Sequence, residues 1–135
     1  MGYRSEVAIK MSRESYNKML ECIEKLEKGK LDEFTKTLNF DGYPSVERVA
    51  QNVKELLELD EDEGVIRMDD EFVTLHFDYV KWYGSYLDVK IIEHFMRLDD
   101  NYDFLRIGED VEDIEEDFHT DTYPFSVLRS IDFCE

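Results

Sequence analysis

Hydrophobic residues alternate with polar ones in several short stretches of the chain, and this period of two predicts β-strands. In residues 3–11, Tyr3, Val7 and Ile9 share one face while charged and small residues occupy the other, which is typical of a half-buried strand. The same alternation recurs later in the chain. It predicts further strands over residues 65–68, 72–79, 102–107 and 123–133.

Other stretches repeat their hydrophobic residues every three or four positions, which predicts amphipathic helices over residues 13–28, 45–59 and 86–98. Ser12 stands where an N-cap is expected, and Gly29 is a suitable C-terminal stop. We expect Ser85 to cap the third helix, because Asp88 follows three residues later as in a capping box. Residues 31–38 favour a short helix, and residues 41–44 favour a turn.

The stretch from residue 72 to residue 107 combines strand, helix and strand in one compact unit. If its two strands pair directly, they run parallel, the helical crossover is right-handed and the sheet is mixed. The whole pattern predicts a single α+β domain over residues 1–135. We expect a mixed or mainly antiparallel sheet of about five strands, with three main helices covering one face.

Charge adds a second feature to this pattern. The hydrophobic fraction of 42% is high enough for a packed core, yet the net charge is −18. Residues 1–58 carry a net charge of −1, whereas residues 59–135 carry −17. Such a field repels nucleic acid and anionic membranes and attracts basic protein surfaces. Solubility alone is an equally ordinary use of acidity.

The acids of the second half concentrate in two runs, and both are candidate partner-binding segments. The first run is Asp60, Glu61, Asp62 and Glu63. The second run comprises Glu109, Asp110, Glu112, Asp113, Glu115, Glu116 and Asp117. The spacing of Val111, Ile114 and Phe118 predicts that the second run forms a helical edge that rests on the core.

Two further inferences concern how these acids could act. On a rigid scaffold the carboxylates could imitate the phosphates of duplex DNA, which number about one per 1.7 Å of helix axis. Trp82 and Tyr83 are the candidate anchors of such an interface, provided that they are exposed, because aromatic residues dominate interface energetics.

The few basic residues of the acidic half support a different hypothesis. Arg106 and Arg129 each share a predicted strand face with hydrophobic neighbours, so each must find a partner or bear a large desolvation cost. A nearby carboxylate would give a structural salt bridge. Alternatively, Arg4, Lys81, Arg106 and Arg129 converge as a pocket for a small anion or nucleotide.

Motifs for catalysis or for a metal are absent from the sequence. The three histidines lack ligand spacing, and neither a paired-cysteine pattern nor HExxH is present. Residues 60–71 imitate part of a calcium loop, but the glycine precedes its required position by one residue. No G-x-S-x-G elbow and no glycine-rich phosphate loop occurs. We therefore predict a protein that is not an enzyme and holds no metal or cofactor.

Cellular location is predicted from what the chain lacks. Cys22 and Cys134 make no disulfide framework, which fits a reducing compartment. There is no signal segment and no apolar run of membrane-spanning length. We expect a protein of the host-cell cytoplasm that contacts neither membrane nor nucleic acid directly; its oligomeric state is left open.

Short motifs at both ends of the chain and through residues 72–131 resemble a loose group of small acidic proteins encoded by phages and prophages. These motifs are Gly2-Tyr3-Arg4-Ser5, Val80-Lys81-Trp82-Tyr83, Arg106-Ile107-Gly108-Glu109-Asp110, Asp113-Ile114-Glu115-Glu116 and Arg129-Ser130-Ile131. No catalytic residue or cofactor comes with this resemblance. It implies a phage or prophage origin, where small acidic proteins often act as inhibitors of host defence.

Three hypotheses for the function follow. In the first, a non-enzymatic phage inhibitor uses its acidic surface as a DNA mimic and blocks a basic nucleic-acid-binding site on a host defence protein. A CRISPR effector or a restriction enzyme would be the target, which gives an anti-CRISPR or anti-restriction role. In the second, a small-ligand module binds an anionic nucleotide signal at the Arg/Lys pocket. In the third, a phage housekeeping or structural protein uses its acidity only for solubility.

Overall fold

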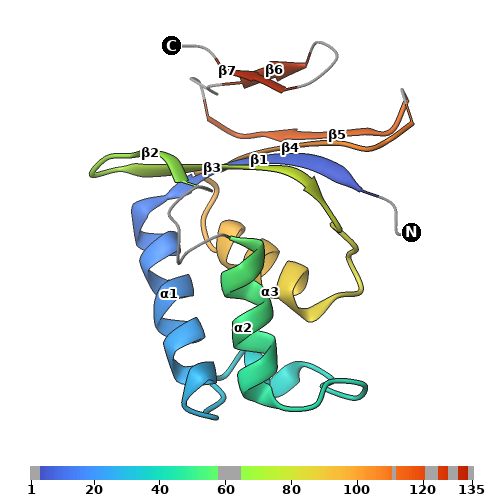
Figure 1. Cartoon of the computed structure of the whole chain (residues 1–135). Helices are drawn as coiled ribbons and strands as arrows, with labels where there is room; N and C mark the ends of the chain where they lie inside the picture. Colours follow the sequence, from blue (N-terminus) through green and yellow to red (C-terminus); the bar gives the residue numbers. More distant parts are fainter. Residues whose placement is uncertain (1–3, 58–64, 111, 121–124, 128–130, 134–135) are drawn as a thin grey trace.

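The computed structural model describes residues 4–57, 65–110, 112–120, 125–127 and 131–133 (Figure 1). The helices are α1 (Arg13–Glu27), α2 (Val46–Leu56) and α3 (Leu87–Met96), with a short 3₁₀ helix η1 (Thr35–Thr37). The strands are β1 (Ser5–Ser12), β2 (Val65–Met68), β3 (Phe72–Val80), β4 (Asp103–Ile107), β5 (Ile114–Phe118), β6 (Phe125–Val127) and β7 (Ile131–Phe133). This is the α+β fold that the sequence predicts, with an antiparallel sheet and three helices on one face (Figure 1).

The strands of the main sheet follow the order β2-β3-β1-β4-β5, and every neighbouring pair is antiparallel. β3 and β4 run in the same direction, but β1 lies between them and pairs with both. The direct parallel pairing considered for residues 72–79 and 102–107 therefore does not occur, and neither does a mixed main sheet. The N-terminal strand takes the central place because both of its faces are buried.

The apolar core lies between the helices and the sheet. β1 contributes the fully buried Val7, Ile9 and Met11 to this core. The other fully buried large side chains of the core include Met19, Leu26, Leu57, Leu75, Phe77, Ile91, Ile92, Met96 and Phe104. Because these residues come from β1, β3, β4 and all three helices, the helices and the main sheet share a single core.

The helix starts are fixed by hydrogen bonds to their first amides. The predicted cap Ser12 is confirmed, since its Oγ accepts from the Ser15 amide at 3.1 Å. The predicted cap Ser85 is wrong, because α3 begins one residue later than Ser85 would require. There the Tyr43 hydroxyl accepts from the Leu87 amide at 3.1 Å, and Asp88 Oδ1 accepts from the Val89 amide at 2.9 Å. These two acceptors take over the role that the serine was expected to fill.

The predicted helical edge over the second acidic run is wrong. Residues 114–118 form the strand β5, which pairs with β4 along its whole length. The alternation of residues 114–118 fits this strand, because Glu115 faces Arg106 across the pair whereas Ile114 lies opposite Ile107. Cross-strand pairing and a buried arginine therefore decide the structure here, against the helical spacing of three hydrophobic residues.

The last predicted strand is also wrong as a single element. Within residues 123–133, the described segments β6 and β7 pair with each other in the antiparallel sense. This small two-stranded sheet lies on the side of the main sheet opposite the helices, near β1 (Figure 1).

The outer face of the main sheet is the face that points away from the helices. β1 was expected to be half-buried, yet Ala8 and Lys10 are buried on this face as well. Ala8 packs with Leu105, and both contact the half-buried Ile107 and Phe118. No helix in the described part of the chain has the length and apolar character that a membrane crossing requires.

Candidate functional site

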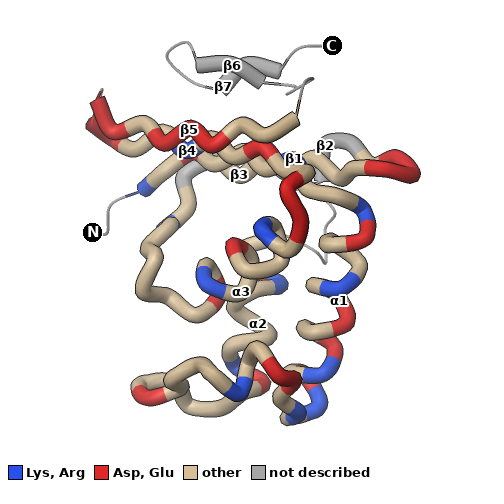
Figure 2. Tube along the Cα trace, turned by 180° about the vertical axis from the view of Figure 1, so that it is seen from behind, with Lys and Arg blue, Asp and Glu red and all other residues tan. Residues whose placement is uncertain are grey.

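The β4–β5 hairpin carries the second acidic run at one end of the sheet. The tube in Figure 2 shows acidic residues around the turn of this hairpin and along β5, which is an edge strand. A second acidic turn joins β2 to β3 at the opposite end of the sheet (Figure 2). The described acids of these two turns therefore lie at opposite ends of the main sheet.

Arg106 holds the hairpin together from within. Its Nη2 lies 2.7 Å from Asp113 Oδ1 and 2.8 Å from Glu115 Oε1, and its Nη1 donates to Ser5 Oγ at 3.1 Å. Only 11% of the Arg106 side chain is exposed. The hydrogen bond to Asp113 is the main reason that the pKa of Arg106 is raised, against the opposing effect of burial. We call this ion-pair cluster of Arg106, Asp113 and Glu115 the Arg106 clamp.

Asp117 is tied into the same end of the molecule by other groups. It accepts a hydrogen bond from the Tyr102 hydroxyl at 2.7 Å, and its Oδ1 lies 2.5 Å from His119 Nε2. Burial alone would raise the pKa of Asp117, but these hydrogen bonds outweigh burial and lower it. Asp117 therefore bonds to Tyr102 and His119, and these bonds make it less available to another protein.

Four acids of the hairpin remain exposed outside the clamp: Glu109, Asp110, Glu112 and Glu116. We call these four residues the outward acids. Glu109 Oε1 also accepts from the Arg4 backbone amide at 2.9 Å, which attaches the turn to the start of β1. The acidic run predicted from the sequence thus divides into three carboxylates that bond to neighbouring side chains, Asp113, Glu115 and Asp117, and the four exposed outward acids.

The other acidic turns use part of their charge for local structure. Asp69 Oδ1 accepts from the amides of Glu71 and Phe72 at 2.9 and 2.8 Å. Asp99 accepts from the hydroxyls of Ser12 and Ser15 at 2.8 and 3.3 Å. Short acidic side chains often close turns in this way, so their number overstates the charge available to a partner.

The aromatic anchors proposed from the sequence do not have the required exposure. Trp82 is only 7% exposed and packs 6.1 Å from the Phe104 ring, while its Nε1 donates to Glu93 Oε1 at 3.2 Å. Its role as an exposed anchor is therefore wrong: the indole belongs to the core. Tyr83 is half-buried and packs edge-on against Tyr86, with ring centroids 4.9 Å apart.

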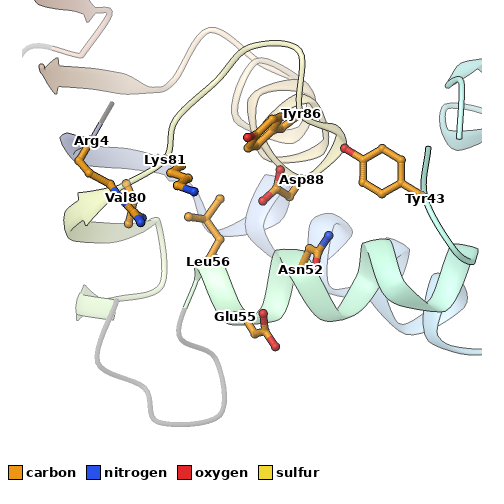
Figure 3. A pocket seen from close by; sticks show the side chains of 9 residues that line it. All are labelled: Arg4, Tyr43, Asn52, Glu55, Leu56, Val80, Lys81, Tyr86 and Asp88. Carbon is orange, nitrogen blue, oxygen red and sulfur yellow. The ribbon is translucent and has the colours of Figure 1, made fainter. Parts of the chain in front are cut away.

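The four basic residues of the alternative anion pocket are only partly brought together. Arg4 and Lys81 line one pocket of about 600 Å³ between α2, the end of β3 and the start of α3 (Figure 3). Arg106 is absent from this lining and donates instead to Asp113, Glu115 and Ser5. The structural salt bridge considered for Arg106 is thus the arrangement found, with Asp113 and Glu115 as its partners.

Some predicted positions lie outside the described residues. These are Asp60, Glu61, Asp62, Glu63 and Arg129.

The remaining lining of the pocket was not predicted from the sequence. It consists of Tyr43, Asn52, Glu55, Leu56, Val80, Tyr86 and Asp88. The sequence pattern predicted Asp88 only as part of a capping box. No local pattern predicts that it lies across a pocket from α2.

A metal site needs several ligating side chains close together within the residues that the structure describes. That part of the chain contains no group of three or more His, Cys, Asp or Glu side chains that could hold a metal ion. Cys22 is buried and has no disulfide partner.

Comparisons of the chain with protein-family models, with curated proteins and with solved structures found no match. The outward acids and the pocket therefore have to be interpreted from the chemistry of this chain alone.

Proposed function

We propose that this protein acts by binding, and that the outward acids of the β4–β5 hairpin dock on a basic surface of another protein. The observation that carries this proposal is the division of the acidic run. Arg106 holds Asp113 and Glu115 in ion pairs and offsets one of their two negative charges, while Glu109, Asp110, Glu112 and Glu116 lie exposed outside these pairs.

The clamp supports binding because it fixes the hairpin before a partner arrives. Arg106 joins the turn, through Asp113, to the edge strand, through Glu115, and to β1, through Ser5. An ordered charged surface loses less conformational entropy on binding than a mobile one, so its charges contribute more to affinity. Carboxylates on such a surface also accelerate encounter with a positive partner.

An edge strand rich in acids has a second physical use. Charged residues on an edge prevent further strands from pairing there, which keeps a sheet from aggregating. This use accounts for Glu116 on β5, but not for the acids of the turn, because Glu109, Asp110 and Glu112 precede the strand. The turn acids are therefore the stronger support for a charged partner.

The partner we propose is a basic, nucleic-acid-binding protein. The net charge of −18 makes direct contact with nucleic acid or an anionic membrane unfavourable. The resemblance to small acidic phage proteins favours a host defence protein, such as a CRISPR effector or a restriction enzyme, as the target. The protein would occupy the basic channel in which that target holds its nucleic acid.

A displacement experiment tests this proposal. A fluorescent DNA duplex is bound to purified restriction enzymes and CRISPR effectors, and its anisotropy is followed as the protein is added. We expect the protein to release the duplex from at least one of these targets. A variant with Glu109, Glu112 and Glu116 changed to Gln and Asp110 to Asn should release it much less, because amides keep the shape but remove the charge.

The matched control removes the same number of charges elsewhere on the surface. Glu21, Glu33, Asp70 and Glu71 are exposed and lie outside the hairpin, so their amide variant should displace DNA as the wild type does. Equal loss in the two variants would mean that total charge acts and the hairpin does not. Failure of the wild type across all targets would overturn the proposal for this class of partner.

A further inference from the structure

The pocket beside α2 has a basic end and an acidic, hydrogen-bonding end. Arg4 and Lys81 lie at one end, and Tyr86 and Asp88 project from the start of α3 towards the middle (Figure 3). Asn52 faces them from α2, and Tyr43 lies at the far end (Figure 3). A pocket of about 600 Å³ is within the size range of small-molecule sites.

Lys81 gives the basic end its affinity for an anion. The chain has 34 acidic residues against 16 basic ones, so most of its cations could find an internal carboxylate. Among the described residues, however, the Lys81 ammonium forms no ion pair, although it lines a pocket together with Arg4. Because Lys81 and Arg4 line the same pocket, an anionic group between them would offset the repulsion of their charges. Phosphate is the anion for which Lys and Arg are the usual ligands.

The opposite end of the pocket offers acceptors. Asp88 is half-buried, and within the described residues its carboxylate bonds only to backbone amides at the start of α3. Burial raises the pKa of Asp88, while the backbone hydrogen bonds oppose this effect. The Asn52 side chain has no hydrogen-bond partner in the described part of the chain. Both groups are therefore available to a ligand that donates hydrogen bonds.

Aromatic and apolar groups complete the lining. Tyr86 is 37% exposed and stands edge-on to Tyr83, so its ring is supported on one side and remains partly accessible. Tyr43 holds its hydroxyl against the Leu87 amide, which fixes its ring at the pocket. Leu56 and Val80 supply apolar surface between the charged ends. A planar ring fits beside such groups, because aromatic faces stack favourably on bases.

We propose that this pocket binds a nucleoside monophosphate, with the phosphate at Arg4 and Lys81 and the base between the tyrosines and Asp88. The lining of this pocket contains none of the outward acids, although the Arg4 backbone amide donates to Glu109 beside it. Guanine suits the acceptor end best, because its N1–H and 2-amino group are adjacent donors to a single carboxylate.

Isothermal titration calorimetry with GMP, IMP, guanosine and inorganic phosphate tests this proposal. We expect saturable binding of GMP, with guanosine and phosphate each at least about tenfold weaker, because each lacks one of the two charge-assisted contacts. IMP lacks the 2-amino group and should bind more weakly than GMP. No saturable binding of GMP, or equal binding of phosphate alone, would overturn the proposal.

Two variants connect the affinity to the two ends of the pocket. Lys81→Gln should weaken GMP binding several-fold, because only Arg4 then remains at the phosphate, whereas Lys90→Gln, an exposed lysine of α3 outside this pocket, should change nothing. Asp88→Asn should abolish the preference for GMP over IMP, and it leaves an oxygen that can accept from the Val89 amide. If GMP binds equally to wild type, Lys81→Gln and Asp88→Asn, the ligand lies elsewhere. Neither variant touches the outward acids, so this proposal can fail without affecting the DNA-displacement result.

Discussion

The two faces of the main sheet are stabilised by different kinds of interaction. On the helix side, β1 presents Val7, Ile9 and Met11, all fully buried among apolar neighbours. On the outer side, the same strand presents Glu6, Ala8 and Lys10, and polar groups are buried there too. Apolar burial is non-directional, whereas hydrogen bonds and ion pairs need particular partners. Apolar burial on the helix side therefore provides stability, whereas the polar contacts on the outer side fix the positions of particular side chains.

Asp103 is the centre of the polar arrangement on the outer face. Its Oδ1 accepts from the amides of His119 and Thr120, both at 2.9 Å, and Oδ2 accepts from the Thr120 hydroxyl. Lys10 is its register partner on β1, and the Lys10 ammonium donates to the same hydroxyl at 3.4 Å. Nearby, Glu6 and His76 meet at 2.7 Å. The contacts of Asp103 and Lys10 attach the end of β5 to β4 and β1, and the Glu6–His76 pair joins β1 to β3.

The largest effect is expected on the helix side. Phe77 is 1% exposed, so Phe77→Ala should lower the free energy of unfolding by about 3–5 kcal/mol through lost transfer energy and a cavity. Urea denaturation followed by circular dichroism measures this change. A loss below about 1 kcal/mol, the cost typical of an ordinary surface or half-buried site, would contradict the assignment of Phe77 to the core.

On the outer side, we expect a smaller loss that depends on the partner. Asp103→Leu should cost about 2–3 kcal/mol, because it leaves the Thr120 amide and hydroxyl without their buried acceptor and the His119 amide with only the Tyr102 carbonyl. Adding Lys10→Met should recover part of this loss, since the two residues meet at Thr120. A double-mutant cycle in urea measures the coupling. Additivity within about 0.5 kcal/mol would show that Lys10 and Asp103 act independently.

The clamp should contribute less than Asp103 but more than a surface ion pair. Arg106→Met should lower the free energy of unfolding by about 1–2 kcal/mol, because two carboxylates lose a mostly buried partner. Arg97→Met is the matched control. Arg97 forms an i, i+4 pair with Glu93 and is 44% exposed, so its loss should cost only about 0.5 kcal/mol. Equal costs in the two variants would contradict a special role for the clamp.

The smallest effect on stability concerns pH. Burial is the largest of the causes that raise the pKa of the Cys22 thiol from 9.0 to about 12. Because the folded pKa lies above the unfolded one, the protonated thiol stabilises the fold fully below about pH 9, and this contribution is lost as the pH rises towards 12. Cys22→Ala should flatten that part of the stability curve.

Thiol labelling checks the same point directly. In a Cys134→Ser background, iodoacetamide at pH 8 should modify Cys22 only as fast as the protein unfolds, since the thiolate is the reactive form. Labelling at the rate of a free thiol in the folded protein would contradict the burial of Cys22.

The helix side could be predicted from the sequence because its pattern is local. Periods of two and 3.6 residues identified β1, β3 and the three helices, and Ser12 was the correct cap of α1. The edge strand of the main sheet could not be predicted in this way. The β5 strand is defined by partners on β4, and Val111, Ile114 and Phe118 give a misleading helical spacing.

The candidate sites show the same limit. Counting acids located the second acidic run, but the clamp that divides it depends on which carboxylates reach Arg106 across the hairpin. Trp82 was proposed as an anchor, provided that it is exposed, because aromatic residues dominate interface energetics, but tertiary packing buries it. The pocket joins Arg4, Asn52 and Lys81 from three distant segments, and no spacing in the sequence relates them.

The salt dependence of binding tests the central claim most directly. The dissociation constant for a target found by DNA displacement would be measured across a range of sodium chloride concentrations, for the wild type and for the variant with neutral outward acids. We predict a steep weakening with salt for the wild type and a much shallower one for the variant, because exposed charges are screened beyond about 10 Å at 0.1 M salt. Equal slopes for the two proteins would contradict the docking of the β4–β5 hairpin on a basic surface.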